Sequence, residues 1–169
     1  MALGEYNFKL EVYNIGNTSK LCEFVRADFI AGEVVQELNG EETLTFTISR
    51  THANFSYLAK FRVVRLVDTS IAGTYVVYRI KRIKQWRDRK RLLCEVYCEH
   101  LKYDLADRVI SEEKHFVQEN PQTVLDYILS FSGGFTRGIC PATPLIDFDI
   151  SFRTCLEALN NLIELLGYD

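Results

Sequence analysis

The stretch that decides the fold is Glu37-Leu-Asn-Gly-Glu-Glu-Thr-Leu-Thr-Phe-Thr-Ile48. Its Asn-Gly pair favours a tight type I′ turn, because both residues tolerate a positive φ angle. The residues after the turn alternate between an apolar and a threonine face, with Leu44, Phe46 and Ile48 on one side and Thr43, Thr45 and Thr47 on the other. The stretch therefore predicts a β-hairpin whose second strand has one buried face.

Further alternating segments lie on both sides of this hairpin. We expect an irregular stretch or short helix at residues 51–59, and strands within residues 7–13, 22–38, 43–50, 61–67, 75–86 and 92–100. The polar link Arg87-Asp-Arg-Lys90 joins the last two strands, which predicts a long hairpin. Six or so antiparallel strands without crossover helices favour a small barrel or sandwich.

The hydrophobic period changes after Arg108. Asn120-Pro121 predicts the start of a helix that reaches Phe131, because asparagine suits the cap and proline suits the first turn. We expect a short strand at residues 146–150, and a final helix capped by Ser151.

These patterns predict an α+β protein with two parts. Residues 1–108 would form an antiparallel β-barrel-like domain, and residues 109–169 would form the helix–strand–helix start of a second α+β domain. About sixty residues of that kind offer little surface for a stable core, so we expect later sequence or another chain to complete this unit.

Composition and charge restrict the classes of protein to which this chain could belong. The chain has 169 residues, 47% of them hydrophobic, and a net charge of −3. Residues 1–108 hold seventeen Lys and Arg against fourteen Asp and Glu, whereas residues 109–169 hold three against nine, so the two parts present different surfaces.

No stretch approaches the roughly 20 apolar residues of a membrane span, so no membrane insertion is predicted. Five cysteines without dense spacing predict reduced and mostly buried thiols, in a protein made in the cytosol.

Four segments, taken in order, resemble one protein family. They are Glu37-Leu-Asn-Gly-Glu-Glu-Thr-Leu-Thr-Phe, Tyr75-Val-Val-Tyr-Arg-Ile, Val96-Tyr-Cys-Glu-His-Leu-Lys-Tyr-Asp-Leu-Ala-Asp107, and the helices at 121–131 and 151–166. Together they resemble the N-terminal region of phage tail-tip or baseplate hub proteins, the prophage tail endopeptidases or tail-associated lysins. The segment from His100 to Asp107 is the most distinctive, since it resembles the family's strand-to-helix corner.

The resemblance implies a structural role at the virion tail tip, after assembly in the cytoplasm of the bacterial host. It implies a homotrimeric hub, in which two barrel-like domains per subunit form a pseudo-sixfold ring. That ring would join the hexameric tail tube or a distal tail protein to the central spike. Contractile secretion systems have a spike of the same architecture, so both origins stay open. Wall-degrading activity is not carried over, because it would belong to sequence beyond these residues.

The chain offers no convincing catalytic or metal-binding pattern. The histidines His52, His100 and His115 lie far apart in sequence, and Cys94 and Cys98 are about 13 Å apart along one strand, too far for one zinc ion. A thiol nucleophile would need a cationic pocket or a helix end, which a core-facing strand does not supply. Asp147 and Asp149 alternate with Phe148, which favours the solvent side of an amphipathic strand. We therefore predict no enzyme and no cofactor.

The alternative is a nucleic-acid-binding module that uses the basic hairpin 79–91. Its eight cations form the candidate interaction surface: Arg79, Lys81, Arg82, Lys84, Arg87, Arg89, Lys90 and Arg91. Barrels of the OB type hold phosphates and stack bases on such hairpins. The negative net charge and the turn position of several of these cations favour a protein-facing or solvated hairpin instead.

Overall fold

The computed structural model describes residues 7–37, 40–71, 73–138 and 143–167. It consists of two compact units, Met1–Leu101 and Lys102–Asp169, and each unit has its own hydrophobic core. Leu105 belongs to the second core. The domain limit after Arg108 stays a prediction.

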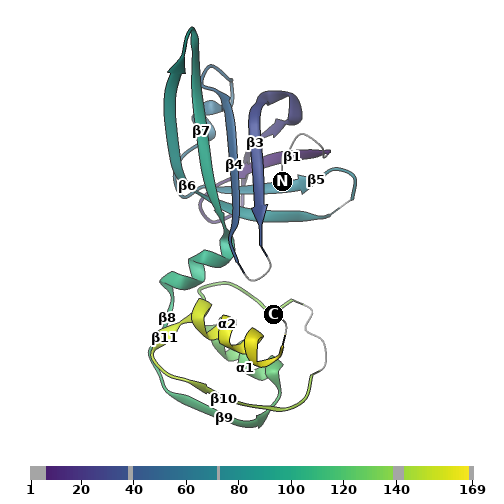
Figure 1. The fold of residues 1–169 in the computed structure, drawn as a ribbon, viewed down its shortest axis with the longest axis vertical. Coiled ribbons are helices and arrows are strands. Elements are labelled where there is room, and N and C mark those ends of the chain that lie inside the picture. Colours follow the sequence, from purple (N-terminus) through teal and green to yellow (C-terminus); the bar gives the residue numbers. More distant parts are fainter. Residues whose placement is uncertain (1–6, 38–39, 72, 139–142, 168–169) are drawn as a thin grey trace. The chain divides into compact units, whose positions relative to one another are not determined.

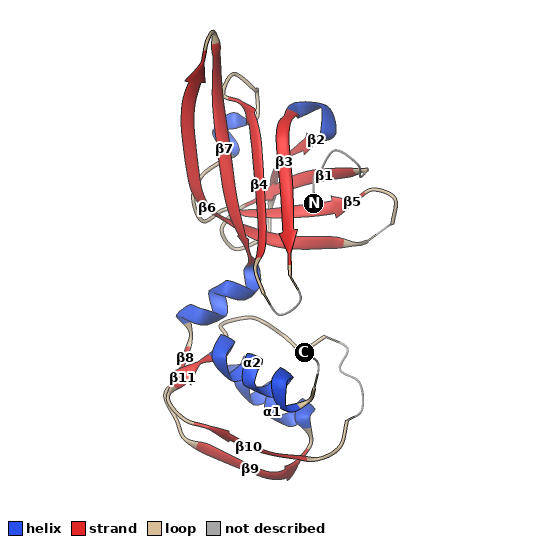
Figure 2. Cartoon of the chain, viewed as in Figure 1, coloured by secondary structure: helices blue, strands red, loops and turns tan. Residues whose placement is uncertain are grey.

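Seven strands form one antiparallel sheet in the first unit (Figures 1 and 2). Their order across the sheet is β2-β1-β5-β6-β7-β4-β3. The strands are β1 (Phe8–Tyr13), β2 (Lys20–Val25), β3 (Phe29–Gln36), β4 (Glu42–Ser49), β5 (Val63–Asp68), β6 (Tyr75–Asp88) and β7 (Arg91–His100). The prediction of an antiparallel β unit without crossover helices is confirmed.

The predicted hairpin that includes residues 37–48 forms strands β3 and β4. They pair from Phe29 opposite Ile48 to Gln36 opposite Glu42. The three apolar side chains of β4 are fully buried, as their alternation predicts: Leu44, Phe46 and Ile48. The predicted type I′ turn involves Asn39, which lies outside the described residues.

One predicted segment is two strands. The sequence suggested a single extended stretch over residues 22–38, whereas a short 3-10 helix, Arg26–Asp28, separates β2 from β3. The Asp28 carboxylate accepts a hydrogen bond from the Val25 backbone N–H at 2.8 Å. Such a local bond offers the backbone an alternative to a strand ladder, which is why the chain turns here.

This corner forces the sheet to curl. Strands β2 and β3 lie at opposite ends of the sheet order, which in a flat sheet would separate them by about 29 Å. The chain from Val25 to Phe29 spans at most about 14 Å, so the two ends must approach each other. In the described residues no ladder joins β2 to β3. The sheet is therefore curled but open, and a barrel-like closure stays a prediction.

An aromatic cluster fills the inside of the corner. The Phe29 ring of β3 lies 6.2 Å from the Phe24 ring of β2 and 5.5 Å from the Phe8 ring of β1. It also meets the Phe46 ring of β4 edge-on at 5.7 Å. These rings join strands from both ends of the sheet order, so side-chain packing holds the curl.

Among the described residues, the second unit combines two α-helices with two short sheets, after a 3-10 helix at Leu101–Asp107. Its helices are α1 (Pro121–Ser130) and α2 (Cys155–Leu165), and its strands are β8 (Val109–Ile110), β9 (Lys114–Glu119), β10 (Ile146–Ile150) and β11 (Arg153–Thr154). Strand β10 pairs with β9, and β11 pairs with β8. The sequence predicted α1, β10 and α2, but not β8, β9 or β11.

The helix caps agree with the sequence in one case only. The Asn120 side chain accepts a hydrogen bond from the Gln122 N–H at 2.9 Å, as predicted for the start of α1. Ser151 does not cap α2, because the chain stays extended through β11. Thr154 is the cap instead, in a reciprocal capping box with Glu157.

Candidate interaction surface

The basic hairpin of β6 and β7 has one unpaired edge. Strand β6 pairs with β5 as far as Arg79, opposite Val63, and with β7 as far as Asp88, opposite Arg91. A bulge at Lys81 lies between the two regions, and bulges of this kind bend a strand. In the described part of the chain, β6 beyond the bulge is therefore hydrogen-bonded to β7 alone.

The basic residues nearest the sheet are held by the protein itself. The Arg79 guanidinium donates to the backbone carbonyls of Ile15 and Phe61, at 3.3 and 2.7 Å. Lys81 lies 3.7 Å from the Glu99 carboxylate. The Arg82 guanidinium carbon lies 5.2 Å from the centre of the Tyr97 ring. Each of these three cations therefore has a partner within the first unit.

The remaining predicted cations gather towards the end of the hairpin. Lys84, Arg87, Arg89, Lys90 and Arg91 are all exposed. None forms an ion pair or side-chain hydrogen bond with another described residue. Arg89 also has a φ of 50°, which places a cation at the turn in the left-handed region. Arg87–Arg91, the hairpin tip, thus carries uncompensated positive charge, and its role as an interaction surface stays a prediction.

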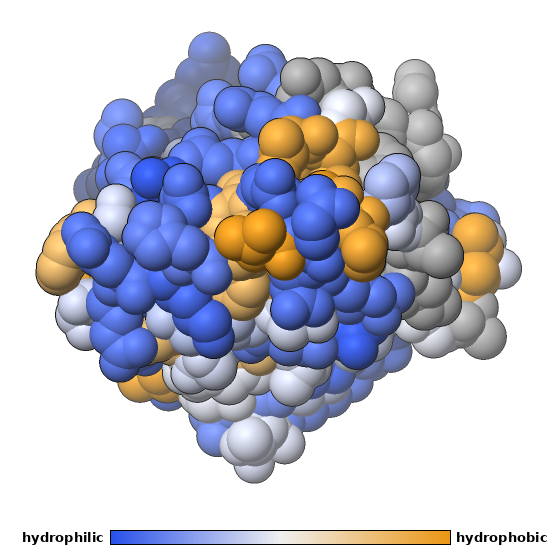
Figure 3. All heavy atoms as spheres, turned by 90° about the horizontal axis from the view of Figure 1, so that it is seen from below, coloured by the Kyte–Doolittle hydropathy of each residue, from blue (hydrophilic) through white to orange (hydrophobic). Residues whose placement is uncertain are grey.

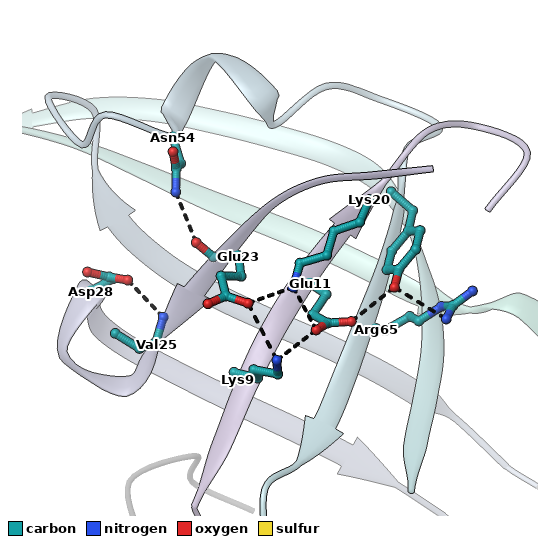
Figure 4. Close-up of polar contacts among 9 residues, drawn as sticks. Lys9, Glu11, Lys20, Glu23, Val25, Asp28, Asn54 and Arg65 are labelled. Carbon is teal, nitrogen blue, oxygen red and sulfur yellow. Dashed lines mark hydrogen bonds and ion pairs between the residues drawn. The ribbon is translucent and has the colours of Figure 1, made fainter. Parts of the chain in front are cut away.

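A second group of charges, on β1 and β2, is fully compensated (Figure 4). Lys9 and Lys20 both contact the Glu11 carboxylate, at 2.8 and 2.9 Å. They also contact Glu23, at 3.4 and 2.6 Å. The Tyr13 hydroxyl donates to Glu11 at 3.0 Å. Glu11 and Glu23 lie directly opposite each other, so the two lysines relieve a repulsion between strands.

This arrangement stabilises the ionised form of Glu11. Partial burial opposes its ionisation, but hydrogen bonds from Lys9, Lys20 and Tyr13 outweigh the burial and lower its pKa to about 2. A lowered pKa in the folded protein means that the carboxylate adds stability above the ordinary pKa of 4.5. That contribution is lost as the pH falls towards 2.

Glu11→Gln should lower the free energy of unfolding by about 1–2 kcal/mol at pH 7, because the amide no longer attracts the two lysines. The difference from the unmodified protein should shrink between pH 4.5 and pH 2, where the carboxylate becomes protonated. Urea unfolding at a series of pH values measures both effects. The exposed Glu164→Gln is the control, and an equal loss in that variant would contradict the explanation.

The three histidines each meet a different carboxylate. His52 lies 3.2 Å from Asp28, His100 lies 3.3 Å from Glu42, and His115 lies 2.7 Å from Asp149. Asp149 raises the pKa of His115 by hydrogen bonding. This last pair is largely exposed to water, at 72% and 76%, so it lacks the desolvated setting of a tuned base.

The two aspartates of β10, Asp147 and Asp149, have different partners. Asp149 binds His115, whereas the Asp147 carboxylate accepts a hydrogen bond from the Gln118 backbone N–H at 2.7 Å. Across the described ranges, no group of three or more His, Cys, Asp or Glu side chains could hold a metal ion.

The described thiols of the first unit are poorly suited to act as nucleophiles. Burial raises the pKa of both Cys22 and Cys94 to about 11, and it raises that of Cys98 as well. A nucleophilic cysteine needs the opposite shift. Together with Cys155, these described cysteines are free thiols, and Cys94, Cys98 and Cys155 are buried.

Apolar side chains reach the surface of the second unit. Among its described residues, five large ones are more than half exposed: Val109, Val117, Leu145, Phe152 and Leu165. Figure 3 shows the most extensive apolar area near the centre of the face seen from below, and smaller apolar areas towards its left and right edges. In the described residues, no helix is both long and apolar enough to span a membrane.

Comparisons with known proteins give the fold a context. Residues 10–100 match a family model described as the prophage endopeptidase tail N-terminal domain. The tail protein from Neisseria meningitidis MC58 is a similar solved structure, with a TM-score of 0.58 and 14% identity. The 43 kDa tail protein of prophage MuSo2 from Shewanella oneidensis is another, with a TM-score of 0.62 and 12% identity. No curated protein matches the chain.

Both structural matches cover 96% of this chain, but only 46% and 51% of the respective tail proteins. The chain thus spans about half the length of these structures. At such low identity the likeness establishes the fold alone.

In the described residues, the charged hairpin of this curled antiparallel sheet has one edge that pairs with no further strand. The chain belongs to the family of the prophage endopeptidase tail N-terminal domain, whose model matches more than half of its residues. Its role is therefore a structural one in a phage tail.

The charge cluster of β1 and β2 was missed in the sequence. Lys9 and Glu11 alternate with buried residues, which marks them as one outward face. The sequence pattern does not reveal their partners on β2, because it predicts one strand over residues 22–38 where the structure has two. Recognising the corner at Arg26–Asp28 would have placed Glu23 opposite Glu11.

Proposed function

We propose that this chain is part of the hub at the tip of a phage tail, and that three copies join the hexameric tail tube to the central spike. The observation that carries this proposal is the family match over residues 10–100. That range includes nearly all of the seven-stranded sheet, so the matched part is the folded first unit.

The edges of the sheet support a role in assembly. Strand β3 lies at one end of the sheet order, and its eight residues contain a single charged side chain, Glu33. Soluble proteins usually protect a free edge with several charges or a proline, because an unprotected edge pairs with other chains. A ring of subunits, each with barrel-like units, would cover such an edge.

The partners follow from the same proposal. The tail-tube or distal tail protein would meet one side of the ring and the spike the other. The chain would be assembled in the cytoplasm of the bacterial host and remain at the tail tip of the virion. We propose no hydrolase activity for these residues, because the separate histidine contacts and the raised thiol pKa values support a structural role.

Phage particles provide the direct test. An antibody against this chain, detected with gold in electron micrographs, should label only the tail end that carries the tip. Quantitative mass spectrometry of purified particles should find three copies for every six tube subunits in one ring. Label along the whole tube, or particles without the chain, would overturn the proposal.

The uncompensated cations of the hairpin tip favour one other candidate, an OB-like module that binds nucleic acid. It predicts salt-sensitive binding of a fluorescent oligonucleotide by the chain. The binding should fall when Arg87, Arg89 and Arg91 are changed to glutamate. Equal binding by the changed and unchanged chains would eliminate this candidate.

A further inference from the structure

The outer face of the sheet contains an acidic trough. It is an open depression of about 330 Å³ over β3, β4 and β7, and its lining residues are Ala31, Gly32, Glu33, Thr45, Phe46, Thr47 and Glu95. Two neighbouring rows of the sheet form it. Ala31, Thr47 and Glu95 lie side by side in one row, and Glu33 lies beside Thr45 in the next. Ala31 has only a methyl group and Gly32 has no side chain, so the trough stays open towards the edge of the sheet at β3.

Within the described part of the chain, the polar side chains that line this acidic trough have no hydrogen-bond or ion-pair partner. Among the described residues, neither Glu33 nor Glu95 forms an ion pair, although Lys84 lies opposite Glu95 in the register. Thr47 is only 9% exposed, lines the trough and makes no side-chain hydrogen bond with another described residue. A nearly buried hydroxyl beside two carboxylates is suited to a ligand that donates several hydrogen bonds and carries positive charge.

The same unit carries the complementary chemistry on the hairpin tip. Its exposed cations, Arg87, Arg89, Lys90 and Arg91, include three guanidinium groups, each of which can donate to two acceptors at once. The tip cannot fill the acidic trough of its own chain. Arg91 and Lys90 are four and five residues from Glu95 along the strand, about 13 to 17 Å.

We propose that the hairpin tip of one copy inserts into the acidic trough of a second copy of this chain. The contact is head-to-tail, because tip and trough are different surfaces of one unit. Contacts of this type close into a ring when the rotation between copies allows it. A nucleic acid is a poor occupant, since its phosphates would meet Glu33 and Glu95. The inference rests on the proposed hub function and names the contact between its subunits.

Charge reversal tests the contact, with self-association measured by sedimentation at low salt. Glu33→Lys with Glu95→Lys reverses the trough, and Arg87→Glu with Arg89→Glu reverses the tip. Each reversed chain should associate at least about tenfold more weakly than the unmodified chain, because like charges then meet. A chain with all four changes should recover association to within about threefold, since its tip and trough are again complementary.

Two further chains make the result specific. Glu113→Lys with Glu164→Lys changes two exposed carboxylates outside the acidic trough by the same charge, and it should leave association unchanged. Glu33→Gln with Glu95→Gln removes the charge with little change of shape, and it should weaken association even if the lysine variant does not fold. Circular dichroism checks the folding of each chain.

Several outcomes would overturn the inference. The unmodified chain could be a monomer at all concentrations, or the chain with all four substitutions could fail to recover association. The control with Glu113→Lys and Glu164→Lys could also lose as much association as the trough variant. If the chain is found at the tail tip in three copies but the chain with all four charge changes does not associate, only the proposed contact is wrong. If that chain associates again but phage particles lack the protein, the hub function is wrong and the contact between copies stands.

Discussion

Replacing Phe24 by alanine is expected to lower the free energy of unfolding of the first unit by about 3–5 kcal/mol, among the largest effects of any single substitution. Phe24 is fully buried on β2 and packs against the Phe29 and His52 rings, at 6.2 and 5.1 Å. Its loss leaves a cavity on the inside of the corner where the sheet curls. Because typical domains are stable by only about 5–15 kcal/mol, much of the margin would disappear.

Urea unfolding followed by the near-ultraviolet signal of the aromatic side chains measures this loss. Phe61→Ala is the matched control, because the Phe61 side chain is 56% exposed and its removal leaves no cavity. That control should change stability by less than about 1 kcal/mol. Similar losses in the two variants would mean that the aromatic corner does not hold the curl.

The strands of the first unit were largely predictable, because alternation of buried and exposed residues is a local signal. The paired strands β6 and β7 and the fully buried Leu44, Phe46 and Ile48 follow directly from it. The break between β2 and β3 was not predictable in this way. It depends on Asp28 bonding back to the Val25 backbone and on the distant order of the strands.

The second unit was harder to predict, since several of its elements have no repeating pattern. Strand β9 begins Lys114-His115 and contains Gln118, which has a φ of 49° at a bulge opposite β10. Strand β11 has two residues, too few for any period. Its pairing with β8 is what displaced the cap of α2 from Ser151 to Thr154.

The candidate site was only partly foreseen. The sequence identified eight cations on one hairpin, but charge alone does not reveal which of them are already neutralised. Arg79 and Lys81 have partners within the unit, whereas the cations of the hairpin tip have none among the described residues. The acidic trough could not be predicted from the sequence. Glu33, Thr47 and Glu95 lie on three different strands, and only the pairing of those strands places them side by side.

Ile128→Ala is expected to unfold most of the second unit while the first stays folded. Ile128 is fully buried on α1, and the Cys155 thiol lies 3.6 Å from its backbone carbonyl oxygen, at the contact between α1 and α2. Removing a buried isoleucine side chain down to alanine costs about 2–5 kcal/mol. A unit the size of Lys102–Asp169, 68 residues, buries a smaller share of its surface than a larger domain, so it has little stability to lose.

Hydrogen exchange followed by mass spectrometry separates the two units in this variant. Amides of α1, α2 and β9 should lose their protection, whereas those of β4 and β7 should keep it, because the two hydrophobic cores have no described residue in common. Leu165→Ala is the control on α2, since its side chain is 52% exposed and should leave protection unchanged. Equal loss of protection in β4 and β7 would mean that the chain unfolds as one cooperative body. Loss of protection in the second unit alone would mean instead that the seven-stranded sheet folds independently. The hairpin tip and the acidic trough would then stay intact when the second unit unfolds.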